Sequence, residues 1–219
     1  MTQPDNNSNG MHTTTAELYR LYNAYNHKFW NRTLPTAQIT VQKADSRSIR
    51  ATAWCSTAKI WQPYAVPMGT TGDQGRYEIN LIAEQLSRHV HLVAVTLLHE
   101  MVHLANSVHG IRDCSSHQYH NKHFKDEAER VWLHVDQVPK YGFAATKATP
   151  QLLEWLGQEP LNPDAFTYYR LGLSDPTLPR GSKTKMKKWR CGCTNVRCAV
   201  DLQAICTNCN KPFTRQDTK

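Results

Sequence analysis

A single helical segment constrains this chain more than any other. The residues from about 91 to 108 are apolar on almost every side of a helix, and Gly110 follows them. The polar residues of the segment fall on one stripe: Thr96, His99, Glu100, His103 and Asn106. Such a helix must be buried, and its stripe must face something other than bulk water, because buried polar groups without partners are costly. Gly110 is predicted to end it, since glycine readily adopts the left-handed backbone of a helix C-terminus.

The stripe carries the pattern His99-Glu100-x-x-His103. Histidines four residues apart lie above one another on a helix, so two imidazole nitrogens can converge on one zinc ion. Glu100 would then point toward the open position of the metal, where it could take a proton from water and pass it to a leaving amine. The alternative is a pair of core histidines with satisfied hydrogen bonds. The buried helix and the shared stripe favour the zinc site.

Two histidines compete to be the third ligand. With His109, the run HEMVHLANSVH has the outline of the extended metzincin motif, with Asn106 where glycine would normally stand. Asparagine tolerates left-handed backbone better than most residues. A metzincin also needs a later methionine turn, and the only later methionine is Met186 in a basic linker. His120 is the other candidate, at the start of a second predicted helix.

The remaining patterns predict a mixed α and β chain. Residues 1–13 are expected to be disordered, and the capping box Thr14-x-x-Glu17 to start a helix that ends near Trp30. Short strands are predicted at 39–41, 49–56, 58–61 and 77–81, and helices at about 118–136 and within 150–157. The strand at 77–81 (YEINL) has two interpretations. It is either an ordinary sheet strand or a strand beside the cleft that pairs with extended substrate.

Five of the seven cysteines lie between residues 191 and 209. The pairs Cys191-Gly-Cys193 and Cys206-Thr-Asn-Cys209 have the layout of a zinc ribbon, in which four thiolates surround a structural Zn²⁺. Cys198 could replace Cys191 or Cys193, but we predict that it is the spare, because 196–202 reads as a hairpin strand. A segment this small needs the metal for much of its folding free energy. The separate Cys55 and Cys114 are predicted to be buried or loop thiols.

Charge is distributed unevenly. Residues 1–175 carry 16 basic and 16 acidic side chains, whereas residues 176–219 carry 10 and 2, so the formal charge of +8 resides in the C-terminal segment. A basic segment beside a neutral body favours an anionic partner, most simply single-stranded or irregular nucleic acid without sequence specificity. The alternative is a solvated basic linker. The candidate contacts are Lys183, Lys185, Lys187, Lys188, Trp189, Arg190 and Arg197.

The N-terminal residues have no basic and apolar pattern of a secretion signal, and no apolar run approaches the length of a membrane span. These features predict a cytoplasmic protein, compatible with association with the nucleoid, that has no membrane partner. Clustered cysteines in such a compartment indicate metal ligation rather than disulfides. We expect a monomer.

The chain resembles the SprT-like metallopeptidase family. The resemblance rests on TLLHEMVH, on the N-terminal helix with Tyr22, Asn23 and Phe29, and on the C-terminal zinc ribbon. It also rests on 120–124 (HNKHF), which matches the family motif H-G-x-x-F/W except that Asn121 replaces glycine. The resemblance implies His120 as the third ligand, Glu100 as the catalytic residue, and two Zn²⁺ ions, one catalytic and one structural.

The resemblance also implies a fold and a substrate class. We expect an α+β chain with a zincin-type metalloprotease domain, an active-site helix and a small antiparallel or mixed sheet, followed by a zinc ribbon. The expected ranges are 14–140 for the domain, 141–188 for an extension and basic linker, 189–213 for the ribbon and 214–219 for a tail. The implied activity is proteolysis of DNA-bound proteins, as in crosslink repair. Two rivals remain: a metzincin-like peptidase with His109 as ligand and no DNA role, and a non-enzymatic zinc protein that binds DNA.

Overall fold

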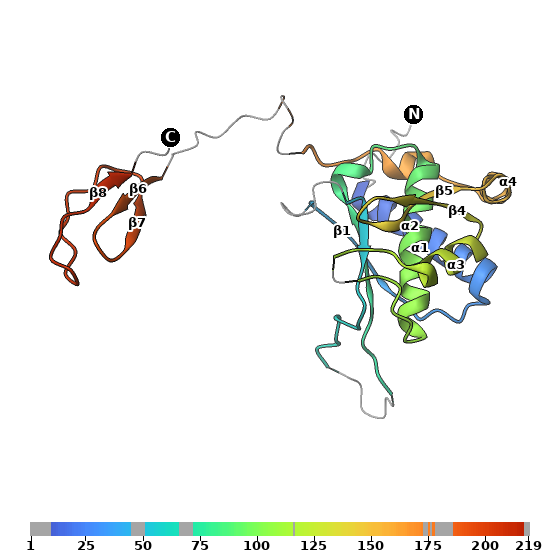
Figure 1. Ribbon diagram of the computed structural model, residues 1–219. Coiled ribbons are helices and arrows are strands. Elements are labelled where there is room, and N and C mark those ends of the chain that lie inside the picture. The colour runs from blue at the N-terminus through green and yellow to red at the C-terminus, as the bar shows by residue number, and fades with distance from the viewer. Residues whose placement is uncertain are drawn as a thin grey trace, which may run out of the picture. The chain divides into compact units, whose positions relative to one another are not determined.

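The computed structural model describes residues 10–44, 51–65, 72–115, 117–172, 175, 177 and 186–216 (Figure 1). The chain divides into two compact units, with the boundary between residues 172 and 173. Within the described ranges, no helix is long and apolar enough to cross a membrane.

The first unit mixes helices and strands, as the sequence predicts, but it has two small sheets instead of the one expected. Its elements are α1 (Gly10–Trp30), β1 (Gln38–Gln42), β2 (Ala53–Cys55), β3 (Glu78–Ile82), η1 (Ala83–Gln85), α2 (Val90–Val108), α3 (Lys122–Arg130), β4 (Leu133–Val138), β5 (Gly142–Ala148), α4 (Pro150–Gln158) and η2 (Pro163–Phe166). The strands form a three-stranded sheet in the order β1-β3-β2 and a β4–β5 hairpin.

In the three-stranded sheet, β3 is the central strand. It runs parallel to β1 and antiparallel to β2, and all five of its residues are buried. Figure 1 shows α1, α2 and α3 on the same side of this sheet. Apolar residues of the strands and of these helices form one hydrophobic core, which fixes α2 in the middle of the unit.

Helix α2 follows the prediction closely. It is buried along most of its length and ends at Val108, after which Gly110 adopts a φ of +69°. The N–H of Gly110 donates to the carbonyl of Ser107 (3.1 Å), and that of Ile111 donates to the carbonyl of Asn106 (2.8 Å). These two hydrogen bonds form the Schellman motif, which satisfies carbonyl groups that the end of a helix leaves without a partner.

The helix predicted over 118–136 is wrong at both ends. It begins at Lys122 and ends at Arg130, and Trp132 then adopts a φ of +66°, which a helix cannot continue. From Leu133 the chain is β4, where Leu133 and Val135 are buried and His134 is exposed. The few apolar residues after Arg130 fit the spacing of a helix as well as that of a strand. Pairing with β5 makes this segment a strand.

Two predictions near the N-terminus also need correction. Residues 10–13 belong to α1, so Thr14 and Glu17 lie inside the helix rather than at its start. The Thr14 hydroxyl faces the carbonyls of Gly10 and Ala165, while Glu17 pairs with Arg20 (2.8 Å). Both side chains also fasten α1 to a distant segment, because Glu17 Oε1 accepts from the N–H of Asn162 (3.1 Å) near the Ala165 contact of Thr14. Residues 1–9 lie outside the described ranges.

Of the predicted strands, 39–41 and 77–81 correspond to β1 and β3, and β2 covers part of 49–56. The segment 58–61 is not a strand: only Trp61 forms a bridge, to Arg76.

The segment after residue 140 completes the first unit instead of extending from it. Strand β5 pairs with β4, and α4 begins at a Thr149 cap and buries Leu152 and Leu156. Helix η2 adds Ala165 and Phe166 to the same core. The compact unit therefore continues past the expected domain boundary at residue 140, to residue 172.

The second unit contains β6 (Lys187–Arg190), β7 (Asn195–Cys198) and β8 (Thr214–Gln216), in the antiparallel order β7-β6-β8. We call residues 186–216 the cysteine module. Its buried side chains in the described range that are apolar or sulfur-containing are Trp189, Cys191 and Cys206. So small a core supplies little folding free energy by itself.

Candidate metal centres

Three histidines converge at α2. His99 and His103 lie one turn apart on this helix, and His120 precedes α3. One ring nitrogen of each lies within 4.8 Å of the others, and the Nε2 atoms of His103 and His120 are 3.1 Å apart. Two nitrogens bound to one tetrahedral zinc would lie about 3.3 Å apart. The donor set and its spacing therefore fit a zinc ion.

The Nδ1 atom of each histidine has a partner on the side away from this point. His120 Nδ1 lies 3.1 Å from the carbonyl of Gln118, His103 Nδ1 lies 2.8 Å from Asp113 Oδ2, and His99 Nδ1 lies 2.9 Å from Thr146 Oγ1. A carbonyl only accepts hydrogen bonds, so the proton of His120 must be on Nδ1 and the Nε2 lone pair is free. The carboxylate of Asp113 requires the same tautomer of His103.

The surroundings of the three histidines favour the neutral form of two imidazole rings. Burial lowers the pKa of His99 well below its usual value, and the neighbouring histidines lower it further. Burial and His103 lower the pKa of His120 to about 4. Burial also acts to lower the pKa of His103, but Asp113 and Glu100 outweigh it and raise that pKa. His99 and His120 are thus neutral at pH 7, which is the form that ligates metals.

Glu100 lies next to the first histidine and is 5% exposed. Across the described part of the chain, its carboxyl group has no hydrogen-bond or ion-pair partner. Burial raises the pKa of Glu100 to about 7; His103 opposes this shift and Asp113 adds to it. A carboxyl group with that pKa can both accept and donate a proton near neutral pH.

His109 is not part of the cluster. It is the exposed C-terminal cap of α2, one turn and a half beyond His103. His123 is also exposed, on α3. Of the two candidates for the third position, the structure brings His120 to the other histidines.

The β4–β5 hairpin holds His120 in place. The N–H of His120 donates to the carbonyl of Tyr141 (2.9 Å), and its carbonyl accepts from the N–H of Phe143 (3.0 Å). Gly142 lies between them with a φ of +64°, and a Cβ there would lie 2.2 Å from the His120 carbonyl oxygen. Only glycine permits this approach.

Comparison with known proteins identifies the family. The model of the SprT-like family matches residues 18–143. The chain belongs to the SprT-like family. Comparisons with curated proteins and with solved structures gave no match. The matched range contains all three histidines and Glu100, and it ends before the cysteine module.

This SprT-like chain departs from the family motif at Asn121, and the structure gives a reason. Asn121 is the N-cap of α3: its Oδ1 accepts from the N–H of His123 (2.8 Å), and its Nδ2 donates to the carbonyl of Arg112 (2.8 Å). Capping satisfies a backbone donor that the helix leaves free. Asparagine therefore fixes the start of the helix directly after the candidate ligand His120.

The strand that pairs with substrate cannot be β3, because β1 and β2 occupy both its edges. The two strands at the edges of the sheet are β1 and β2. Of these two strands, β2 packs against α2, the helix that carries His99 and His103. The interpretation of YEINL as an ordinary sheet strand is the correct one.

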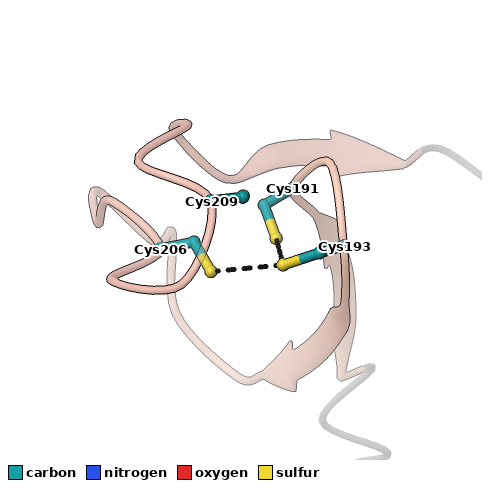
Figure 2. Close-up of side chains that lie close together, drawn as sticks. All are labelled: Cys191, Cys193, Cys206 and Cys209. Atoms are coloured by element: carbon teal, nitrogen blue, oxygen red, sulfur yellow. Dashed lines mark hydrogen bonds between the residues drawn. The ribbon is translucent and has the colours of Figure 1, made fainter.

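The cysteine module brings Cys191, Cys193, Cys206 and Cys209 together (Figure 2). Their four sulfur atoms lie within 4.8 Å of one another. Cys193 Sγ lies 3.6 Å from the sulfurs of Cys191 and Cys206. Sulfurs around one tetrahedral zinc lie about 3.8 Å apart, so the group fits a structural metal site. Cys198 lies outside it, and its thiol donates to the carbonyl of Val200.

The predicted nucleic-acid contacts divide between two faces of the β7-β6-β8 sheet. Lys188 is directly opposite Arg197, and Arg190 is two residues along the same strand, so these three exposed cations share one face. Lys187 and Trp189 face the other side, where Lys187 pairs with Asp201 (2.7 Å). Trp189 is 8% exposed, so its ring offers little surface to a nucleic acid. Lys183 and Lys185 lie outside the described residues.

The sequence does not predict the residues that support the three histidines, namely Asp113, Thr146 and Gly142. Asp113 follows the glycine that ends α2, which is a weak signal at best. No pattern marks Thr146, because its contact with His99 joins residues 47 positions apart.

Proposed function

We propose that this protein is a zinc-dependent metallopeptidase with a zincin-type active site. The observation that carries the proposal is the convergence of three histidine nitrogens, each with a hydrogen-bond partner behind its ring. Beside them lies the buried carboxyl group of Glu100, which has no partner among the described residues. A purely structural site has no use for a carboxyl group of this kind. The SprT-like family is associated with the same activity.

The residues divide the chemistry as follows. His99, His103 and His120 would hold the catalytic zinc. When bound, the ion supplies Lewis acidity that activates water and polarises a carbonyl group. Glu100 takes a proton from the attacking water and later delivers it to the leaving amine. β2, which is an edge strand of the described sheet and packs against α2, could offer backbone N–H and C=O groups to an extended peptide.

We further propose that the substrates are proteins associated with DNA, in a reaction like the repair of DNA–protein crosslinks in the cytoplasm. Lys188, Arg190 and Arg197 support this, because no described acidic side chain pairs with them. Exposed cations bind the phosphate groups that every nucleic acid carries. We therefore expect binding without sequence specificity and with strong salt dependence. A second zinc, in the cysteine module, would hold this face in shape.

The test is cleavage of a purified DNA-binding protein by the full chain, with and without single-stranded DNA, beside a Glu100→Gln variant that keeps the size of the side chain. We expect cleavage that requires DNA and that Glu100→Gln reduces at least 1,000-fold, since it removes the base on which the reaction depends. Cleavage that ignores DNA would remove the DNA part of the proposal. No cleavage by zinc-loaded protein would favour a binding protein instead.

A further inference from the structure

We propose that Asp113 and Asn106 are positioning residues of the histidine centre, which set the orientation of one ligand and its spacing from another. The inference rests on the proposed metal site but not on peptidase activity. Neither residue contacts the point where the ligand nitrogens meet. Asp113 acts through His103, and Asn106 acts through Asp113.

The side chains form a buried chain of hydrogen bonds. Asp113 is 4% exposed and Asn106 is 5% exposed. One oxygen, Asp113 Oδ2, accepts from His103 Nδ1 (2.8 Å) and from Asn106 Nδ2 (2.9 Å). Because Asn106 is one turn after His103 on α2, the helix itself fixes the carboxylate that aims the ring. This gives a role to the asparagine of the polar stripe.

The backbone of the same residue reaches the other ligand. The carbonyl of Asp113 accepts from the N–H of Asn121 (2.9 Å), and the carbonyl of Arg112 accepts from Asn121 Nδ2 (2.8 Å). Asn121 directly follows His120. One short loop therefore fastens two ligands that come from different elements, His103 on α2 and His120 before α3.

A carboxylate behind a metal-bound histidine fixes its tautomer and makes the ring a stronger ligand. Burying that carboxylate is costly unless a cation compensates it. Such a buried charge is tolerable here because a divalent ion would lie on the far side of the imidazole. Loss of a supporting residue of this kind typically lowers metal affinity about 10–100-fold.

The experiment measures Co²⁺ binding to the full chain by absorption. The four thiolates give intense sulfur-to-metal bands in the near ultraviolet as well as d–d bands, whereas the histidine site gives only weak d–d bands. The histidine site is read from the d–d absorption that remains after the thiolate spectrum, scaled to its near-ultraviolet bands, is subtracted. We expect Asp113→Asn to weaken the histidine site about 10–100-fold and to alter its d–d spectrum, with the thiolate bands unchanged. Asn106→Ala should weaken it less. The control is Asp126→Asn, which removes the same charge from an exposed residue paired with Lys122.

The melting temperature of the metal-free variants separates positioning from a merely structural role. We expect it to fall by no more than a few degrees in Asn106→Ala while affinity falls. Unchanged Co²⁺ affinity in both variants, or a loss equal to that of Asp126→Asn, would overturn the proposal. If Asp113→Asn does not fold, Asn106→Ala decides. A wild-type chain that binds no Co²⁺ at the histidines would overturn the proposed metal site itself, whereas binding without cleavage would affect only the proposed activity.

Discussion

Gly142 is the residue near the histidine centre that should tolerate substitution least. We expect Gly142→Ala to destabilise the first unit by about 2–4 kcal/mol, since the new Cβ combines a left-handed backbone with a clash against the carbonyl of His120. Metal affinity should fall with it, because His120 must shift. The control is Gly157→Ala in α4, where a Cβ has open space and favours the helix. Thermal unfolding of both variants checks this; equal stability would show that the hairpin yields to the added methyl group.

The sequence predicts the candidate ligands but not the residues that support them. His99, Glu100 and His103 could be found because helical spacing makes their proximity a property of one segment. Choosing His120 over His109 required the family motif, since spacing alone left both open. Asp113 and Thr146 support the ligands through contacts between separate elements. Such contacts depend on tertiary packing, which no local pattern records.

At the scale of elements, the β7-β6-β8 sheet makes a separable prediction. Changing Lys188, Arg190 and Arg197 to Gln should weaken binding of a fluorescent single-stranded oligonucleotide at least 10-fold. It should also lower the slope of log affinity against log salt by about 2, as expected for three lost phosphate contacts. The measurement is fluorescence anisotropy in the Glu100→Gln background, so that proteolysis cannot interfere.

The matched control changes three other cations of the module, Lys187, Lys211 and Arg215, to Gln. Lys187 and Arg215 share the single carboxylate of Asp201, at 2.7 and 3.9 Å, so they have less charge to offer a phosphate. We expect less than a threefold loss. An equal loss in the two variants would mean that net charge attracts the nucleic acid and that no particular face binds it.

Elements were predictable where one periodicity ran long enough. Helix α2, with 19 residues, is clear from its sequence, whereas the nine residues of α3 merge with the start of β4. The apolar residues from Phe124 to Val135 fit a helical period, but Leu133 and Val135 also alternate as in a strand. Pairing with β5 makes the residues after Arg130 a strand, and β5 lies later in the chain. The residues of α3 and β4 alone therefore do not show where the helix ends and the strand begins.

For the whole molecule, the division into two units predicts two independent metal sites. Metal analysis of purified protein should find two zinc ions per chain, with one lost in His120→Ala and the other in Cys209→Ser. His109→Ala is the control and should keep both. The losses should add in the double variant, since the ligands of each site come from a different unit.

The two units should also respond differently when a chelator removes both ions. The first unit buries a continuous core of helices and strands, but the cysteine module buries little besides Trp189 and two cysteines. Removing zinc should therefore unfold the module and leave the first unit folded with a weakened site. Hydrogen exchange resolved by peptide would show this as full exchange in 186–216 beside protection in α2. Protection of both segments, or loss of both together, would mean that the units do not fold separately.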